Sequence, residues 1–274
     1  DIAMFDDGTG WAVGDGFDIF YFDGKDWIRK RVIMAGLYGY EMHGIAALGQ
    51  DNVWFVGDHN LQTHWNGSLL QDSGGGRRDN VFGDDGNSSG FSSISVTTDG
   101  HGWAAGPEGP PAVRQRGKWY DSSSVPLGNT MQSVLMRSES DVWFGSGLIS
   151  DGKSKTPIVR GDGFTWTSMS SGSHLPIMQL SEGPQDTLWA VGSSHAVQGR
   201  PLQSAILSFV NNEAWQVDLQ LTDQGLTSIA WSESAGTWAG GSKLLHLDGT
   251  NWQVVNGVLE NEFVKDIDLP ADGR

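Results

Sequence analysis

The chain has 274 residues and no cysteine, which is enough for one large domain or two ordinary ones and excludes a disulfide framework. Its 33 acidic residues outnumber its 17 lysines and arginines, so nucleic acid and anionic membranes, which bind basic surfaces, are poor partners. The 39 glycines and 13 tryptophans, with 18% charged residues, favour short strands joined by tight turns, and no apolar run reaches the about 18 residues of a membrane-spanning helix.

A unit of four short strands is predicted in residues 1–32. The apolar run DIAMF is followed by GTGWAVG, by DIFYF and, after a glycine turn, by DWIRKRV. Trp11 and Trp27 each follow a turn-forming cluster in this unit. Because so small a unit cannot bury its own apolar face, it predicts further copies along the chain.

Five more copies follow. The first tryptophan recurs in VWFVG, GWAAG, VWFGS, LWAVG and TWAGG, at spacings of 43, 49, 40, 46 and 49 residues. The second recurs after a glycine or asparagine turn, except in the second copy, HWNGSLL, where we expect Leu69 in its place. The structural tryptophans of the repeat are Trp11, Trp27, Trp54, Trp103, Trp119, Trp143, Trp166, Trp189, Trp215, Trp238 and Trp252.

Four strands repeated every 40 to 49 residues predict an all-β fold, a β-propeller of four-stranded antiparallel blades. We expect a single domain over 1–274, with repeats at about 1–33, 43–72, 91–124, 131–170, 177–220 and 226–256. Residues 263–274 read as an exit strand or as the start of a further copy, and six blades are favoured over seven. The tryptophans are expected to pack as wedges between neighbouring blades.

The repeat resembles the BNR/Asp-box class of propellers, most closely the photosystem II assembly-factor-like group, whose blades carry Gly-Trp-Ala-Val-Gly followed by an Asp-Gly-x-x-Trp turn. Residues 10–27, GWAVGDGFDIFYFDGKDW, match this pattern best, and the resemblance covers about 1–255. It implies structural roles for the motif residues and says little about function. An aspartate that can cap its own turn precedes five of the six anchor tryptophans, namely Asp7, Asp51, Asp99, Asp141 and Asp186.

The connections between strands differ on the two faces that a propeller would have. The turns between the first and second and the third and fourth strands of each copy are uniform, whereas the other connections include long segments such as 72–90 and 145–157. Long loops on a rigid scaffold commonly carry recognition, and tyrosine with arginine is enriched at interfaces. We therefore expect a loop-rich binding face that includes Tyr38, Tyr40, Arg77, Arg78, Phe82, Lys153, Lys155 and Arg200.

No catalytic residue, metal site or cofactor is predicted. Sialidases share the Asp-box propeller but use an arginine cluster, and here only Arg137 stands on a predicted inner strand. Asp84, Asp85 and Asn87 are oxygen donors of the kind that Ca²⁺ uses, yet their spacing does not match an EF-hand loop. The histidines show no HxH or HxxxH pairing, which argues against zinc.

We therefore expect a non-catalytic interaction module that presents its loop-rich face to a protein or cell-surface partner, alone or within a larger chain or assembly. Carbohydrate binding, as in a lectin-like propeller with a cell-surface glycan as its ligand, is the alternative, and a glycosidase-like enzyme comes third. The first residue is not methionine, cysteine is absent and the composition is acidic. These features favour an extracellular or cell-surface location, or the periplasm, without insertion into a membrane.

Overall fold

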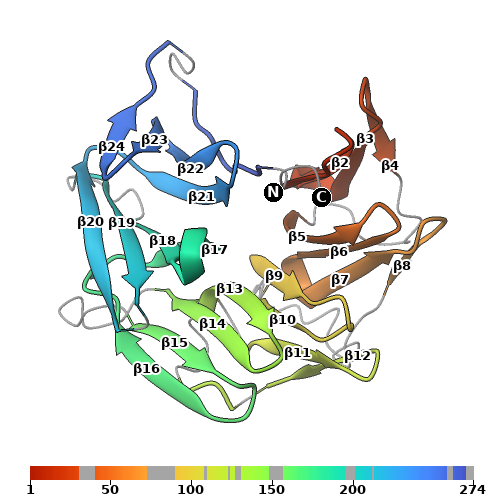
Figure 1. Ribbon diagram of the computed structural model, residues 1–274. Helices are drawn as coiled ribbons and strands as arrows, with labels where there is room; N and C mark the ends of the chain where they lie inside the picture. Colours follow the sequence, from red (N-terminus) through yellow and green to blue (C-terminus); the bar gives the residue numbers. More distant parts are fainter. Residues whose placement is uncertain are drawn as a thin grey trace. The chain divides into compact units, whose positions relative to one another are not determined.

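The computed structural model describes residues 1–30, 41–72, 90–107, 110–122, 124–126, 131–147, 157–194, 201–211, 213–257 and 262–269. Six four-stranded antiparallel sheets follow one another along the chain, and the strands of each sheet lie side by side in chain order (Figure 1). This confirms the predicted all-β propeller with six blades. In the described residues no helix is long and apolar enough to cross a membrane.

The first three blades contain the following strands: β1 (Ile2–Met4), β2 (Gly10–Gly14), β3 (Asp18–Phe22) and β4 (Trp27–Lys30); β5 (Met42–Gly49), β6 (Asn52–Gly57), β7 (Leu61–Trp65) and β8 (Leu70–Asp72); β9 (Ser93–Val96), β10 (Gly102–Ala105), β11 (Ala112–Gln115) and β12 (Lys118–Asp121).

The last three blades contain β13 (Met131–Ser138), β14 (Asp141–Ser146), β15 (Pro157–Gly161) and β16 (Trp166–Ser170); β17 (Ile177–Glu182), β18 (Leu188–Ser193), β19 (Gln203–Val210) and β20 (Ala214–Thr222); β21 (Leu226–Ser232), β22 (Gly236–Gly241), β23 (Leu244–Asp248) and β24 (Asn251–Val254). Single 3-10 turns occur at Asp15–Phe17, Asp58–Asn60 and Pro184–Asp186.

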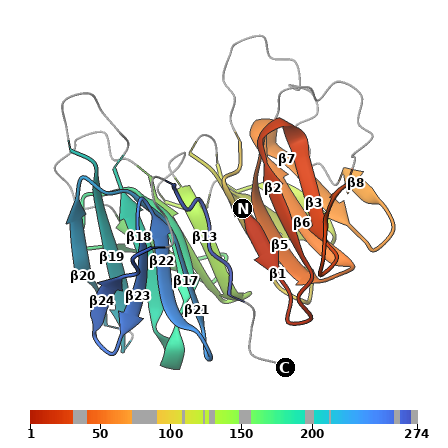
Figure 2. The ribbon, with the colours of Figure 1, turned by 90° about the horizontal axis from the view of Figure 1, so that it is seen from above.

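The chain divides into two compact units. Unit 1 comprises residues 1–142 and 161–166, and unit 2 comprises residues 143–160 and 167–274. In unit 1 the sheet β1–β4 lies next to the sheet β5–β8, as both views show (Figure 2). An apolar core of Trp11, Ile19, Phe55 and their neighbours fills the space between these two sheets.

Tryptophans from successive sheets pack against each other within each unit. In unit 1 the ring centroids of Trp54 and Trp119 are 6.0 Å apart, and those of Trp103 and Trp166 are 5.4 Å apart. In unit 2 the corresponding pairs are Trp143 with Trp215, at 6.0 Å, and Trp189 with Trp252, at 5.7 Å. In each pair the second strand of one sheet meets the start of the fourth strand of the next.

The second sheet departs from this rule in a way that corrects the expectation for Leu69. Leu69 is 57% exposed, so it does not replace the missing tryptophan. Trp65, at the end of β7, instead packs on Trp11 with 5.4 Å between ring centroids. Trp65 thus contacts the first sheet from β7, whereas the repeat predicts a tryptophan at the start of β8.

The glycine of the Trp-x-x-Gly motif is required where two strands approach closely. A Cβ on Gly106 would collide with the backbone carbonyl of Gly90, and one on Gly241 with that of Gly225. Gly14, the equivalent residue of the first sheet, has no atom within 4 Å of such a Cβ. The motif therefore marks a tight backbone contact in some sheets and not in others.

Side-chain hydroxyls join the first strands of successive sheets. In unit 1 the hydroxyl of Ser92 donates to the carbonyl oxygen of Gln132 at 2.7 Å, and the hydroxyl of Ser93 accepts the N–H of Val134 at 3.1 Å. These bonds seat β13 along β9. The backbone ladder of the sheet β9–β12 is thus supplemented by hydroxyl bonds to the first strand of the next sheet.

The C-terminal segment 262–269 is seated on β21 in unit 2. The hydroxyl of Thr227 donates to the carbonyl oxygen of Val264 at 2.9 Å, and the hydroxyl of Ser228 accepts the N–H of Ile267 at 2.8 Å. The segment is not assigned to any sheet. It nevertheless takes the position on β21 that a following first strand takes elsewhere.

Candidate functional site

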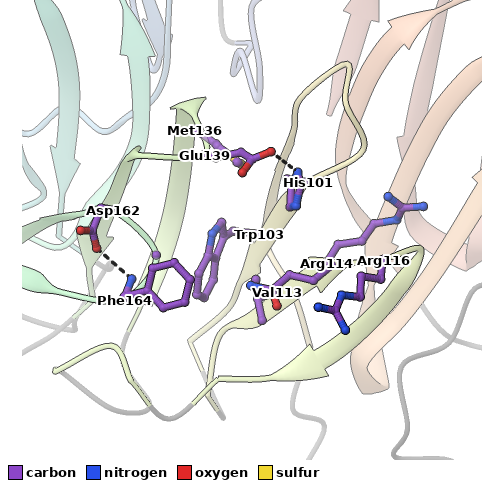
Figure 3. Close-up of a pocket in the computed structure, with 12 residues that line it drawn as sticks. His101, Trp103, Val113, Arg114, Arg116, Met136, Glu139, Asp162 and Phe164 are labelled. Atoms are coloured by element: carbon purple, nitrogen blue, oxygen red, sulfur yellow. Dashed lines mark hydrogen bonds and ion pairs between the residues drawn. The ribbon is translucent and has the colours of Figure 1, made fainter.

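A pocket of about 230 Å³ lies in unit 1 between the turns of the third and fourth sheets (Figure 3). Its wall is formed by parts of β10, β11 and β13 and by four turns: the end of the turn before β10 at His101, 115–118 between β11 and β12, 138–141 between β13 and β14, and 161–166 between β15 and β16. These are the short, uniform turns of the repeat.

The apolar part of the pocket combines buried and exposed side chains. Trp103 and Met136 are buried, at 3% and 7% exposure, whereas Phe164 is 81% exposed. Val113 completes this apolar lining. A phenylalanine so exposed next to a buried indole offers apolar surface to a ligand.

The turn that carries Phe164 is held by Asp162. One carboxylate oxygen of Asp162 accepts the N–H of Phe164 at 2.9 Å and the N–H of Thr165 at 2.7 Å. These hydrogen bonds lower the pKa of Asp162, the bond from Thr165 most. Gly163 has a φ of 87°, which a residue with a side chain adopts only with strain. Phe164 is consequently presented on a fixed turn.

Two arginines line the pocket, and they differ in their partners. Arg114 donates to the carbonyl oxygen of Gly100, and its guanidinium lies 4.4 Å from the ring centroid of Trp54. Burial lowers the pKa of Arg114. Arg116 is exposed at a turn position with a φ of 50°, and in the described part of the chain it makes no ion pair. Arg116 is therefore the cation available to a ligand.

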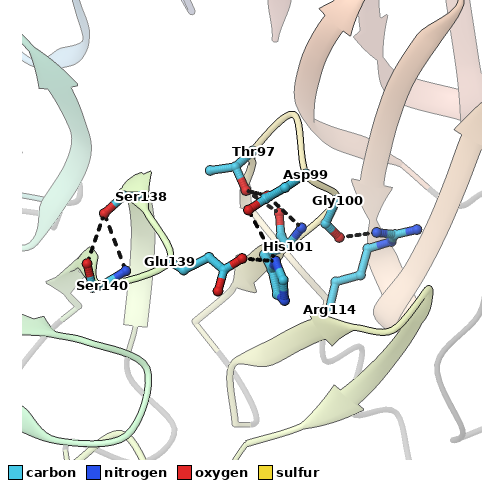
Figure 4. Close-up of polar contacts among 8 residues, drawn as sticks. All are labelled: Thr97, Asp99, Gly100, His101, Arg114, Ser138, Glu139 and Ser140. Carbon is cyan, nitrogen blue, oxygen red and sulfur yellow. Dashed lines mark hydrogen bonds and ion pairs between the residues drawn. The ribbon is translucent and has the colours of Figure 1, made fainter.

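A cluster of Asp99, His101 and Glu139 lies at the edge of the pocket (Figure 4). Nδ1 of His101 is 2.5 Å from Oε1 of Glu139 and 3.4 Å from Oδ2 of Asp99. Asp99 also accepts hydrogen bonds from the hydroxyl of Thr97 and from the backbone N–H of His101. The hydroxyl of Thr97, and then the neighbouring carboxyl group of Glu139, lower the pKa of Asp99, whereas the proximity of Asp99 raises the pKa of Glu139.

The residues that the sequence nominated for binding form a different set. The eight loop-face residues (Tyr38, Tyr40, Arg77, Arg78, Phe82, Lys153, Lys155 and Arg200) and the oxygen donors Asp84, Asp85 and Asn87 all lie outside the described residues. The loop-rich face therefore stays a prediction.

The pocket itself was missed, although the repeat contains two signals for it. Phe164 stands in GDGFTW where the first copy has Lys25 in FDGKDW. His101 stands two residues before its anchor tryptophan, where the first copy has Thr9. Comparing copies for departures from the repeat, rather than for its matches, would have found both.

No protein-family model and no curated protein sequence matches the chain. Solved structures that share the fold include YCF48 bound to D1 peptide, with a TM-score of 0.62 and 15% identity over 93% of this chain and 80% of that one. The extracellular domain of the hybrid two-component system BT4673 from B. thetaiotaomicron has a TM-score of 0.66 and 13% identity.

A third similar structure is PorZ, a surface component of the type-IX secretion system of Porphyromonas gingivalis, with a TM-score of 0.65 and 12% identity. The chain is covered to 98% by the BT4673 match and to 92% by the PorZ match, but it spans only 35% and 40% of those two chains. At these identities the likeness shows the propeller fold alone.

Proposed function

We propose that this chain is a non-catalytic binding module that captures a segment of a partner protein at the pocket of unit 1. The observation that carries the proposal is the exposed Phe164, held by a capped turn beside the buried Trp103 and Met136. Large aromatic side chains on rigid turns are efficient binding anchors, because little conformational entropy is lost when they are covered.

The dimensions and charges of the pocket indicate what it can take. Its volume of about 230 Å³ is below the roughly 300 to 1,000 Å³ of typical small-molecule sites, and suits one large side chain of a peptide. Arg116, exposed at the rim, can pair with a carboxylate. The favoured ligand is therefore an extended segment with an aliphatic or aromatic residue next to an acidic one.

The structural relatives support this proposal. YCF48, which has the same fold, has been observed with a bound D1 peptide. Two other relatives are an extracellular domain and a bacterial surface component. They support an extracellular or cell-surface location for this chain, which we retain as part of the proposal.

Selection from a peptide-display library on immobilised chain 1–274 tests the proposal. We expect selected peptides to share an apolar residue flanked by Asp or Glu. Phe164→Ala should weaken their binding by about 30-fold, as for a 2 kcal/mol interface anchor, without changing the melting temperature. Lys25→Ala, at the equivalent turn of the first sheet, is the matched control and should bind as the parent does.

Three outcomes would contradict the proposal. Peptide binding that survives Phe164→Ala and Arg116→Ala but is lost on Arg77→Ala with Arg78→Ala would place recognition on the loop-rich face. Binding on a glycan array that depends on Phe164 would favour the lectin-like alternative, since an exposed aromatic ring can also stack on a sugar. Turnover of an aryl glycoside would favour an enzyme.

A further inference from the structure

The cluster at the edge of the pocket has a counterpart between the first two sheets of unit 1. In each case the turn between the first and second strands of one sheet contacts the corresponding turn of the next sheet. Asp7 and Asp99 both stand four residues before their tryptophans, and Gln50 and Glu139 do so in the following copies. We call these contacts the first seam (Asp7, Thr9, Gln50) and the third seam (Asp99, His101, Glu139).

The first seam is satisfied by hydrogen bonds within the chain. The side-chain amide of Gln50 donates to a carboxylate oxygen of Asp7 and to the hydroxyl of Thr9, at 3.2 Å from the latter. The same aspartate accepts the backbone N–H of Thr9 at 2.9 Å. One carboxylate thus receives an amide donor from the neighbouring sheet and carries the only charge among these three side chains.

The third seam replaces that neutral donor by a second carboxylate. Glu139 takes the position of Gln50 and brings a carboxylate oxygen into contact with His101 and within 4.8 Å of Asp99. An ionised carboxylate can only accept hydrogen bonds, and two carboxylates held together repel each other unless a proton or a cation lies between them. A positive charge would therefore stabilise the two carboxylates of the third seam, whereas the single carboxylate of the first seam already has an amide donor.

Arg114 and Arg137, two arginines near the cluster, have other partners. Arg114 donates to the carbonyl oxygen of Gly100 and lies over the ring of Trp54. Arg137 lies 3.4 Å from the carboxylate of Asp141. The imidazole of His101, at the centre of the cluster, is thus the basic group in contact with both carboxylates.

The donor atoms have the spacing of a metal site. One atom from each of the three side chains lies within 4.8 Å of the others. The 3.4 Å between Nδ1 of His101 and Oδ2 of Asp99 is close to the roughly 3.4 Å that separates two ligands of a tetrahedral ion bound at about 2.1 Å. Nδ1 of His101 and Oε1 of Glu139 are 2.5 Å apart, a direct contact that Glu139 would exchange for a bond to the ion by turning its exposed carboxylate. The turn hydrogen bonds of Asp99 fix the orientation of one ligand in advance.

We propose that Asp99, His101 and Glu139 form a binding site for a divalent metal ion of the zinc type at the third seam. An imidazole nitrogen with two carboxylate oxygens is a donor set that zinc accepts, whereas Ca²⁺ and Mg²⁺ prefer oxygen alone. Three protein ligands leave a further position for water or for a donor from a bound segment. The inference rests on the seam and stands whether or not the pocket binds peptide.

Calorimetric titration of the EDTA-treated chain 1–274 with Zn²⁺ tests this site. We expect one ion per chain and a rise in melting temperature with Zn²⁺ concentration. Glu139→Gln and His101→Thr each introduce the residue type that the first seam carries, so both variants should fold. Each should weaken Zn²⁺ binding by about 100-fold or more, since even loss of an outer-shell partner costs about 10- to 100-fold.

The control is His43→Ala, which removes another histidine of unit 1 that contacts a carboxylate, at 2.9 Å from Asp58. This variant should bind Zn²⁺ as the parent does. Binding that is unchanged in both third-seam variants, or no binding at millimolar Zn²⁺, would overturn the proposal. Tight Ca²⁺ binding without Zn²⁺ binding would overturn the assigned metal class.

Discussion

Strand β13 in unit 1 and the C-terminal segment 262–269 in unit 2 are held by the same kind of contact, but only β13 belongs to a four-stranded sheet. Ser92 and Ser93 bond to the backbone of β13, and Thr227 and Ser228 bond in the same way to the segment. The first strand of one sheet therefore offers hydroxyl groups that bind the backbone of the segment that follows it, and we call this binding position a seat. The C-terminal segment occupies such a seat on β21 although it belongs to no sheet.

The two seats differ in how the seated strand is secured. In unit 2, the carboxylate of Asp266 accepts the hydroxyl of Ser228 at 2.7 Å and the side-chain amide of Gln179 at 3.2 Å. Val264 and Ile267 fill the space in front of Gly240. A carboxylate and two apolar side chains thus anchor a segment that has no strand ladder.

The largest expected effect comes from removing the seated segment. Deleting 262–274 should lower the free energy of unfolding by about 4 kcal/mol, since two partly buried aliphatic side chains and several hydrogen bonds are lost. Urea unfolding followed by tryptophan fluorescence measures the change. A loss within about 0.5 kcal/mol, as for a surface change, would mean that the segment is a dispensable exit strand.

A smaller loss of unfolding free energy is expected at the close backbone contact between Gly241 and Gly225. Gly241→Ala should cost about 3 kcal/mol, because its Cβ meets the carbonyl oxygen of Gly225 and the backbone must move. Gly14→Ala, where the same Cβ meets no atom within 4 Å, is the control and should change stability by less than about 1 kcal/mol. Equal losses in the same unfolding measurement would refute the close-approach explanation.

The hydroxyl contacts can be separated by a double-mutant cycle. Ser228→Ala should cost about 1 to 2 kcal/mol in the full chain, because its hydroxyl serves both Ile267 and Asp266. In the chain without 262–274 this cost should largely vanish. Ser93→Ala, whose partner is in β13, should cost the same in both chains, and a loss of its effect in the shortened chain would show that the two seats are coupled.

The smallest effect is a dependence on pH that arises in unit 1. Burial, and then the charge of Arg114, lower the pKa of His64, which is stacked on Trp54 and lies 2.8 Å from Asn52. The unfolded chain therefore binds the proton more readily, and stability should decrease as the pH falls below the ordinary histidine value of 6.5. An NMR titration of the imidazole at or above that value would contradict this assignment.

The strands and turns could be predicted because every copy of the repeat carries its own local signals. Turn glycines, apolar runs and a tryptophan at a fixed place recur six times, so an error in one copy does not affect the others. Trp65 shows the limit of this reasoning: two large side chains, Trp65 and Leu69, were available in the second copy, and which of them faces the preceding sheet depends on the pairing of β7 with β8.

The candidate site could not be predicted in the same way. Its residues come from strands and turns spread over 99–164, and nothing within a single copy of the repeat shows that these segments meet. Of the ligands proposed for zinc, Glu139 stands 40 residues after Asp99 and 38 after His101, which no short spacing rule includes. Only the register between neighbouring sheets brings Glu139 to His101, and this register is a property of the packed structure.

The hydroxyl bonds between first strands have a consequence for how this chain folds. They join residues 37 to 41 positions apart, about the length of one repeat. Each of these bonds can therefore form as soon as one further repeat is available. The entropy cost of closing the chain between the bonded residues is nearly the same for all of them. Folding can begin at any repeat and spread to its neighbours, as in other proteins stabilised by nearest-neighbour interfaces. The amide groups that such bonds protect should then exchange with solvent by the opening of single repeats, and not only through global unfolding.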